Sequence, residues 1–338
     1  PTHVVLAKEL ASDVLSNLTL LDASFDEFAV LDTPQFDFIA LHGIWTWVSV
    51  DNQRTIVQLL KSKLKPGGAV YISYNTLPGW AILSPLRELL AQHAAYASPS
   101  GDSSSVKAQR ALAFVGELEK NQVQFITGNR ALMERLAQVR QSPIEYVTHE
   151  YMNGQHLPRY FSEVAEALEE AKLTFVGSSR VLNTLDGVNL TQAGIQHLAS
   201  IANPTLRQVA RDFYTAAMFR QDVFVRGRLG LSPIERSAAL DAVRLHLLSS
   251  PAEVPRKING PLGEISMQEA IYDPVLEKLA AAGGKGLLLG DLRTVGQLKS
   301  LPPEAAVEAA CMLIAAGSVY PVVDTRPHAD PTIAKKLA

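Results

Sequence analysis

An apolar run, a helical pattern and a second apolar run follow one another over residues 36–75, and this order constrains the fold more than any other feature. The first run, FDFIALHG, is apolar on both faces, as a buried parallel strand should be. Apolar residues at helical spacing then cover Asn52–Leu64, and the turn sequence KPGG leads into the β-prone run AVYISYN. A further helix begins at Ser84-Pro85. Strands alternating with helices predict a doubly wound α/β sheet.

The start of the chain lacks the glycine-rich turn on which a nucleotide-type ligand normally rests in such a sheet. A short β-prone run begins at Asn17 and ends at Asp22, only 17 residues precede Leu18, and no glycine occurs before Gly43. A strand–helix–strand unit needs about 30 residues. We therefore expect a further segment, carrying the first strands, between PTHVVL and AKELASDVLSN. An intact mass equal to the 36.7 kDa of the printed sequence would exclude this expectation.

Composition and charge argue against several classes of protein. With 338 residues, of which 47% are apolar and 19% charged, the chain can bury a sizeable core in two or three domains. Its net charge of −3 argues against a general nucleic-acid binder. The single cysteine, Cys311, excludes an intramolecular disulfide and a thiolate metal cluster, and its helical surroundings predict a buried structural thiol. The longest apolar stretch, residues 309–323, is too short for a membrane helix, so we expect a soluble, cytoplasmic protein without a bound metal.

The rest of the sequence is mostly helical in pattern. The predicted elements are one or two amphipathic helices over residues 106–140, an extended segment over 143–153, a helix over 159–173, a strand over 174–179 and a helical pattern over 189–250. The sequence SPIE, at residues 232–235, fits a helix capping box. Charged residues of FRQDVFVRG, such as Arg220 and Asp222, are expected to form surface ion pairs.

Five segments of the sequence resemble one bacterial family. They are NLTLLDASF, FDFIALHGIWTWVS, LKPGGAVYISYNTLPGW, HEYMNGQHLPRYFSEVAEAL and FRQDVFVRG. The family is that of class I S-adenosylmethionine-dependent methyltransferases with a methyltransferase regulatory domain, and it includes protein-lysine methyltransferases that act on outer-membrane proteins. The KPGG turn before an apolar strand is shared by many class I methyltransferases, whereas HG-W-WV followed by SYNT-PGW is much more specific.

The resemblance implies a Rossmann-like sheet with a helical cap, then a mostly helical region and a winged-helix-like C-terminal domain. The methyltransferase domain would cover residues 1–182, with the cap at about 101–142, and the helical region and the C-terminal domain would cover 183–254 and 255–338. Residues 255–338 contain nine basic and nine acidic side chains. Such a balanced domain offers no basic surface for phosphates, so we expect contacts with protein rather than nucleic acid. A homodimer remains an alternative to a monomer.

The cofactor implied by the resemblance is S-adenosyl-L-methionine, and ligands of open α/β sheets bind at the carboxyl ends of the strands. The predicted cofactor-binding residues are Asp22, Ala23, Leu41, His42, Gly43 and Trp45. The Asp22 carboxylate would accept a hydrogen bond from the adenine amine, or would instead bond its own backbone as a turn residue. Gly43 would let the backbone approach the ligand. An aromatic face at Trp45 would attract the sulfonium, or would pack the cap against the sheet.

The transfer of a methyl group to an amine predicts a second set of residues. The predicted catalytic residues are His42, Trp47, Tyr74 and Asn75, and the predicted substrate-binding residues are Trp80, Glu150 and Tyr151. A tyrosine hydroxyl and an asparagine carbonyl can hold an incoming amine by hydrogen bonds. A lysine amine has an ordinary pKa of about 10.4 and must lose a proton before it attacks, which an aromatic, water-poor pocket assists. The structural alternatives are a hydrogen-bonded His42, a turn at Asn75 and an Arg partner for Glu150.

Other functions remain open at this stage. The methyl acceptor is predicted to be a protein side chain, most simply lysine, and a small-molecule acceptor is the rival within the same reaction class. A regulatory or scaffold protein on a degenerate methyltransferase core is the alternative outside it, because the glycine-rich motif is missing. Zinc-protease chemistry is excluded, since no second histidine follows four residues after His149 in THEYMN.

Overall fold

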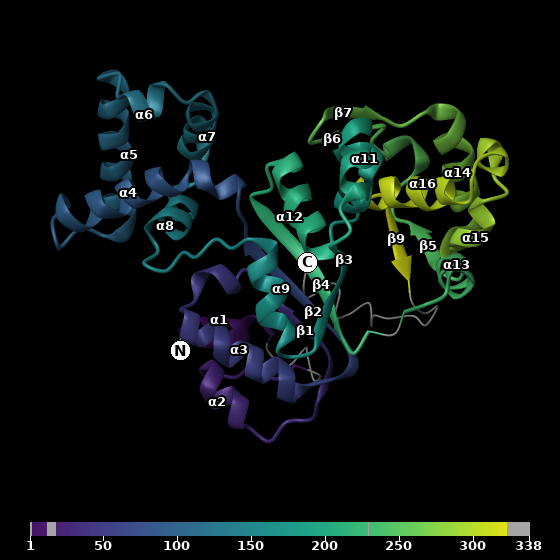
Figure 1. Ribbon diagram of the computed structural model, residues 1–338, viewed down its shortest axis with the longest axis horizontal. Coiled ribbons are helices and arrows are strands. Elements are labelled where there is room, and N and C mark those ends of the chain that lie inside the picture. The colour runs from purple at the N-terminus through teal and green to yellow at the C-terminus, as the bar shows by residue number, and fades with distance from the viewer. Residues whose placement is uncertain (1, 12–17, 229, 323–338) are drawn as a thin grey trace. The chain divides into compact units, whose positions relative to one another are not determined.

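The computed structural model describes residues 2–11, 18–228 and 230–322, which form two compact units (Figure 1). The first, called the sheet unit here, comprises Gln35–Ser179 and Leu190–Arg228. The second, called the terminal unit, comprises the described residues of Pro1–Pro34, Arg180–Asn189 and Leu229–Ala338. All residues predicted for catalysis and substrate binding belong to the sheet unit.

A four-stranded sheet in the order β1-β2-β4-β3 is the centre of the sheet unit. Its strands are β1 (Phe36–Leu41), β2 (Leu64–Asn75), β3 (Leu173–Ser178) and β4 (Phe219–Arg226). Strands β1 and β2 are parallel, and helix α3 (Val50–Lys63) connects them, which confirms the predicted strand–helix–strand order. Strand β4 is antiparallel to both of its neighbours, β2 and β3.

Strand β1 lies at the edge of this sheet, so the prediction of a strand buried on both faces is wrong. Leu41 is its one buried residue, and Phe38 is 57% exposed. Among the described strands, β2 is the partner of β1. The predicted KPGG turn is part of β2, where Leu64 pairs with Phe36 and Ala69 already pairs with Phe38. The extra residues between them form a bulge, in which the φ angle of Gly67 is +79°.

Residues Phe219–Arg226 form strand β4, so the helical structure predicted for residues 189–250 is wrong in this part. Its buried residues, Arg220, Asp222 and Phe224, alternate with less buried ones, as strand geometry requires. The register places these three opposite Tyr74, Ile72 and Val70 of β2 on one face of the sheet. The prediction that Arg220 and Asp222 form surface ion pairs is wrong, because both are buried in the centre of the sheet.

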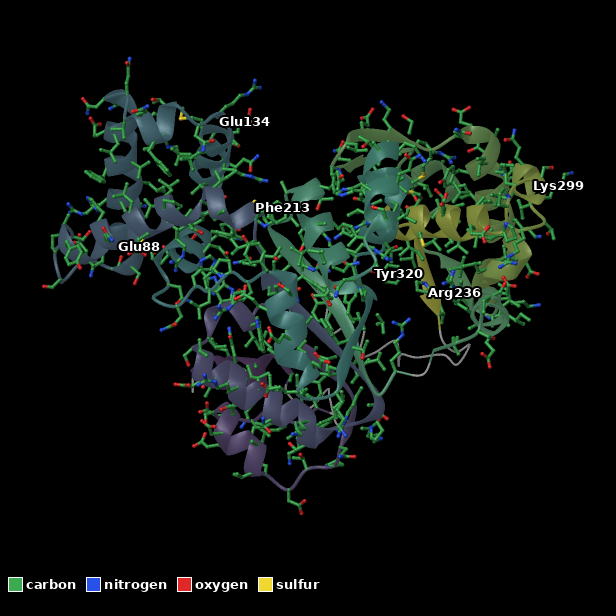
Figure 2. All side chains as sticks on the ribbon, in the orientation of Figure 1. Glu88, Glu134, Phe213, Arg236, Lys299 and Tyr320 are labelled. Carbon is green, nitrogen blue, oxygen red and sulfur yellow. The ribbon has the colours of Figure 1, made fainter. Side chains whose placement is uncertain are left out.

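Helices cover this face of the sheet. Helix α3 buries Ile56, Val57, Leu59 and Leu60, and helix α9 (Phe161–Glu169) buries Phe161, Val164 and Leu168, as predicted from their apolar spacing. Two further helices, α11 (Gln192–Ser200) and α12 (Pro204–Thr215), precede β4, and α12 packs against α9. Phe213 of α12 is 58% exposed and stacks on Tyr160 (Figure 2).

Five helices between β2 and β3 form a cap with an apolar core of its own, which includes Trp80, Leu90, Val115, Leu136 and Tyr151. They are α4 (Ser84–Tyr96), α5 (Ser104–Lys120), α6 (Gln124–Thr127), α7 (Arg130–Gln141) and α8 (Ile144–Met152), and the turn η3 (Gly79–Ile82) leads into them. Charged side chains such as Glu88 and Glu134 point outward from the cap (Figure 2).

The cap is larger than the predicted residues 101–142, because α4 and α8 share its core. The extended segment predicted over residues 143–153 is also wrong, because most of these residues form helix α8. Val147 and Tyr151 are buried four residues apart, and Ile144 packs against the same core three residues earlier. This is helical spacing, and the β-branched residues Val147 and Thr148 obscured it in the sequence.

The terminal unit consists of helices, turns and short strands, and its apolar core is formed by residues between Leu182 and Val319. Its helices are α1 (Thr2–Ala11), α2 (Phe25–Val30), α10 (Asp186–Asn189), α13 (Pro233–Asp241), α14 (Glu269–Ala282), α15 (Leu289–Leu292) and α16 (Glu304–Ala315), with the turns η4 (Val181–Thr184), η5 (Pro251–Glu253), η6 (Gly283–Lys285) and η7 (Gly296–Ser300). Its strands are β5 (Arg244–Leu247), β6 (Lys257–Gly260), β7 (Gly263–Ser266), β8 (Leu287–Leu288) and β9 (Val319–Val322), in a sheet of order β8-β5-β9 and a β6-β7 hairpin. The predicted capping box before α13 is present, since Ser232 Oγ accepts a hydrogen bond from the Glu235 backbone N–H.

One prediction for the terminal unit needs correction. Residues 18–24 have no regular secondary structure, so the predicted strand ending at Asp22 is wrong over its described part. The predicted domain boundaries at residues 182 and 254 stay predictions. Cys311 lies in α16 as predicted and is half-buried, and burial raises the pKa of its thiol. Within the described ranges, no helix combines the length and the apolar composition needed to cross a membrane.

Candidate functional site

The carboxyl ends of β1 and β2 meet, as the sequence predicts for two parallel neighbours. Leu41, the last residue of β1, pairs with Ile72, three residues before the end of β2. The Gly43 backbone N–H donates to Ser73 Oγ at 2.7 Å, and the φ angle of Gly43 is +63°. Glycine adopts this left-handed conformation without the strain that a side chain would bring. Apart from Gly43 and its two chain neighbours, no atom of the described residues lies within 4 Å of the place where a Cβ would stand, so the backbone at Gly43 is open to a bound molecule on that side.

His42 is exposed at this edge and is part of a polar chain. The Tyr71 hydroxyl lies 3.0 Å from His42 Nδ1 and accepts a hydrogen bond from Gln221 Nε2 at 2.8 Å. The two rings stack, with centroids 5.8 Å apart. Because the hydroxyl accepts from Gln221, its own proton is available to His42 Nδ1, which fixes the orientation of the imidazole.

The three tryptophans have different surroundings, although all follow the ends of β1 and β2. Trp45, in the turn η2 (Trp45–Trp47), is only 2% exposed, and no acceptor for its Nε1 lies among the described side chains and backbone. The Trp45 indole is thus part of the core, and its predicted contact with the cofactor stays a prediction. Trp47 is half-buried and contacts two histidine rings, and Trp80 lines a pocket.

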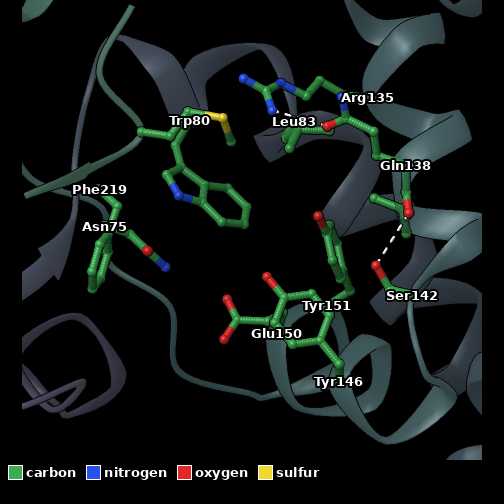
Figure 3. Close-up of a pocket in the computed structure, with 12 residues that line it drawn as sticks. Asn75, Trp80, Leu83, Arg135, Gln138, Ser142, Tyr146, Glu150, Tyr151 and Phe219 are labelled. Atoms are coloured by element: carbon green, nitrogen blue, oxygen red, sulfur yellow. Dashed lines mark hydrogen bonds between the residues drawn. The ribbon is translucent and has the colours of Figure 1, made fainter. Parts of the chain in front are cut away.

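This pocket, of about 440 Å³, lies between the strand ends and the cap (Figure 3). Its lining comprises Asn75, Met218 and Phe219 at the strand ends, Trp80 and Leu83 at the start of the cap, and Arg135, Gln138, Val139, Ser142, Tyr146, Glu150 and Tyr151 from α7, α8 and the turn between them. Asn75 and Phe219 are register partners on neighbouring strands, which explains why both face it. Three of the predicted residues, Trp80, Glu150 and Tyr151, are thus brought together with Asn75.

Polar groups at the pocket are held by a buried arginine of the cap. Arg87 donates to the backbone carbonyls of Glu150 and Asn153 and so fixes the end of α8. Burial lowers the pKa of Arg87, although Glu88 and Glu150 act in the opposite direction. The Glu150 carboxylate, 17% exposed, lies 3.3 Å from His149 Nδ1. Burial raises the pKa of the Tyr146 and Tyr151 phenols, so both rings are neutral hydrogen-bonding groups.

His156 was not among the predicted site residues, yet it joins the two halves of the site. Its ring centroid lies 4.7 Å from that of Trp47 and 4.5 Å from that of Trp80. Its Nε2 lies 3.0 Å from Asn75 Nδ2. Burial and, to a lesser extent, the nearby Arg87 lower the pKa of His156 to about 4, so the imidazole is neutral at physiological pH.

Tyr74 does not line the pocket together with Asn75 as the sequence predicts, because neighbouring residues of a strand point to opposite faces. Asn75 faces the pocket, whereas Tyr74 is fully buried on the helix-covered face. Its hydroxyl donates to Asp222 Oδ2 at 2.7 Å, and burial raises its pKa well above the ordinary value. Tyr74 therefore belongs to a buried charge cluster, defined here as Tyr74, Gln208, Asp212, Arg220 and Asp222, and not to the pocket.

The remaining predicted residues are less constrained. Asp22 and Ala23 are exposed residues of the terminal unit, and their contact with adenine stays a prediction. The described part of the chain holds no group of three or more His, Cys, Asp or Glu side chains that could bind a metal ion. The pocket residues that sequence reasoning missed include Arg135 and Tyr146, which lie on the cap and carry no local motif.

Residues 143–226 match the family model of the "predicted methyltransferase regulatory domain". This region starts immediately before α8 and ends with β4, so it supplies Glu150, Tyr151 and His156. The match confirms the regulatory-domain part of the resemblance that the sequence shows.

Two uncharacterized proteins are similar to this chain in sequence. An uncharacterized protein of Synechocystis sp., sll1526, is 38% identical over 325 residues, which are 96% of this chain and 63% of that protein. An uncharacterized protein of Rickettsia prowazekii, RP028, is 29% identical over 170 residues, which are 48% of this chain and 65% of that protein.

A solved structure, PKMT2 from Rickettsia typhi in complex with AdoHcy, shares the fold with a TM-score of 0.69 at 22% identity, over 97% of this chain and 66% of that one. A second structure of PKMT2 gives a TM-score of 0.67 at 21% identity. The fold is thus that of a mixed α/β protein with a central sheet, as predicted. The chain spans a little less than two thirds of the length of the proteins it matches.

Proposed function

We propose that the chain is part of a methyltransferase that transfers a methyl group from S-adenosyl-L-methionine to the side chain of a protein lysine. The observation that carries the proposal is the pocket at the strand ends, in which the Glu150 carboxylate and the Asn75 amide lie among the rings of Trp80, Tyr146 and Tyr151. A carboxylate attracts an ammonium group, and aromatic faces stabilise a cation. The name of PKMT2 and its complex with AdoHcy, the product form of the cofactor, support the same reaction.

The residues that would hold the reactive end of the cofactor are His42, Gly43 and Trp47, since the backbone at Gly43 is open and Trp47 reaches toward the pocket through His156. S-adenosylmethionine supplies an electrophilic methyl group on a sulfonium when it is bound. The predicted cofactor contacts of Asp22, Ala23, Leu41 and Trp45 stay predictions.

The pocket prepares the amine in two ways. Glu150 draws the lysine ammonium in, and its carboxylate is the base that can accept the proton, because removal of the amine from water disfavours its charged form. Asn75 Oδ1 accepts a hydrogen bond from the remaining N–H and orients the nitrogen lone pair. Displacement at the methyl group requires attack in line with the breaking bond, so this positioning is worth several kcal/mol of the barrier.

Other parts of the proposal concern the terminal unit. We propose, from the sequence, that residues 255–338 form a winged-helix-like domain that contacts protein, that the protein substrate or a homodimer partner binds there, and that the protein acts in the cytoplasm. Helices α14 to α16 and strands β8 and β9 lie within these residues and support a small domain, although the strand that pairs with both, β5, lies before residue 255.

Calorimetry with S-adenosylmethionine, followed by transfer of a labelled methyl group to proteins of a cell lysate, tests the proposal. We expect heat of binding, label on protein, and methyl-lysine after hydrolysis. Intact mass is measured in parallel, because a natural protein of 36.7 kDa would exclude the further segment expected to hold the glycine-rich turn. A natural protein that neither releases heat with the cofactor nor transfers label would instead be a regulatory or scaffold protein.

A further inference from the structure

The segment between α8 and α9 is fastened to the ends of both parallel strands. The Leu157 backbone N–H donates to the Thr46 carbonyl at 2.8 Å, and the Arg159 backbone N–H donates to the Asn75 carbonyl at 3.2 Å. In return, Thr76 Oγ1 donates to the Arg159 carbonyl at 2.7 Å. His156 therefore has a backbone whose position is fixed relative to Asn75, rather than one that is free to move as in a surface loop.

The imidazole itself is held between two indoles. Its centroid lies 4.7 Å from that of Trp47, at an interplanar angle of 37°, and 4.5 Å from that of Trp80, at 64°. Aromatic pairs at these separations are favourable in tilted and edge-on arrangements. The ring thus has one orientation, in which Nε2 points to Asn75 Nδ2 at 3.0 Å.

The 3.0 Å contact between two nitrogens defines the hydrogen positions. With the Asn75 amide oriented as in this structure, Nδ2 donates, so Nε2 of His156 accepts and the proton of the neutral ring is on Nδ1. A protonated imidazole would present an N–H at Nε2 and would force the amide of Asn75 to turn over. Burial, together with Arg87, lowers the pKa of His156 to about 4, which keeps the ring neutral and leaves one ring nitrogen able to accept.

We propose that His156 is a positioning residue for the methyl acceptor: by accepting from Asn75 Nδ2, it turns Asn75 Oδ1 toward the pocket, where Oδ1 receives an N–H of the substrate amine. This inference rests on the proposed function and adds how the site selects its substrate. The pocket distinguishes an amine that still carries an N–H from a cation of equal charge that carries none. Glu150 and the aromatic rings attract both, and only the first can bond to Asn75.

Nuclear magnetic resonance of the ¹⁵N-labelled chain tests the orientation directly. We expect the His156 signals, assigned by their loss in His156→Phe, to show a protonated Nδ1 and an unprotonated Nε2 at neutral pH. A proton on Nε2, alone or with one on Nδ1, would overturn the inference.

Binding of two small cations tests the consequence. The probes are n-butylammonium, which has N–H groups, and n-butyltrimethylammonium, which has the same charge and none. We expect His156→Phe to weaken binding of the first about tenfold and to change binding of the second by less than about twofold. His156→Gln keeps an acceptor for Asn75 Nδ2 and should restore the preference.

A double-mutant cycle separates positioning from a general effect on structure. In an Asn75→Ala background, His156→Phe should have no further effect on n-butylammonium binding, because His156 acts through Asn75. Additive effects, or an unchanged preference in His156→Phe, would refute the inference while leaving the proposed function intact. A wild-type chain that binds neither cation would overturn the proposed function, and this inference with it.

Discussion

Replacement of Arg220 by methionine tests whether the buried charge cluster stabilises the sheet unit. The Arg220 side chain is 8% exposed and donates to Asp212 Oδ1 at 2.6 Å and to Asp222 Oδ2 at 2.7 Å. Its guanidinium lies 4.5 Å above the ring of Phe161. Methionine retains much of the volume but leaves two carboxylates, 5% and 1% exposed, without their cation.

The expected loss of stability follows from this geometry. Removal of one partner from a buried ion pair costs about 3–5 kcal/mol, because the other charge remains uncompensated. Two such charges remain in Arg220→Met, so we expect a value in the upper half of that range. Since domains are stable by about 5–15 kcal/mol, the variant should lose a large part of the free energy of unfolding.

Urea unfolding followed by tryptophan fluorescence measures this loss in the sheet unit alone, because the three tryptophans of the chain, Trp45, Trp47 and Trp80, all lie there. Arg130→Met is the matched control, since the Arg130–Glu134 pair on α7 is exposed on both sides. Such an exposed pair contributes little to stability, because water and salt screen its charges. If Arg220→Met lowered the free energy of unfolding no more than Arg130→Met does, the reasoning about the buried cluster would be refuted.

The pH dependence gives a second check on the same variant. Burial raises the pKa of Asp212 to about 6 from its ordinary 3.8, although Arg220 acts against this shift. A carboxyl with a raised pKa in the folded state adds stability below its unfolded value, and this contribution is lost as the pH rises through the folded value. Without Arg220 the pKa of Asp212 should rise further. The loss of unfolding free energy caused by Arg220→Met should therefore be larger at pH 8 than at pH 5. A larger loss at pH 5 would contradict the argument.

Further predictions concern the pocket and two glycines. Glu150→Gln should weaken n-butylammonium binding about tenfold in a titration followed by magnetic resonance, while Glu145→Gln, exposed on the same helix, should leave it unchanged; equal effects would exclude a direct role of the carboxylate. Gly43→Ala should cost about 1 kcal/mol of unfolding free energy, because of its positive φ alone. Gly79→Ala should cost about 2 kcal/mol or more, because a Cβ would stand 2.4 Å from the Ala217 carbonyl oxygen; unfolding in urea that ranked the two the other way would contradict this reasoning.

The parts of the fold that were predictable from the sequence depend on local apolar spacing. Strand β1, helix α3 and strand β2 follow one another with uninterrupted patterns, and their parallel pairing brings Leu41 and Asn75 to one edge. Strand β4 was not predictable in this way. Its buried positions hold Arg220 and Asp222, whose burial depends on each other and on Tyr74, 146 or more residues away in the sequence.

The candidate site was predictable only in part, for similar reasons. Trp80, Glu150 and Tyr151 were found through the resemblance to a family, and the pocket brings them together. Tyr74 was assigned to the site with Asn75, because neither residue alone reveals which face of the sheet it takes. No sequence pattern pointed to His156 as a site residue, because a single histidine in a loop has many possible roles. The rings that it contacts, Trp47 and Trp80, are also distant in sequence.

Strand β4 comes last of the four strands in the chain and yet lies between β2 and β3. As the ribosome releases the chain from its N-terminus, β3 has no strand to pair with until Phe219–Arg226 has emerged, and the sheet closes only at that moment. The region matched by the family model, residues 143–226, is therefore not a module that can be excised or grafted. Its strand β4 pairs with Ala69–Asn75 of β2, which lies outside the region. A fragment designed to fold on its own must carry residues 36–75 as well.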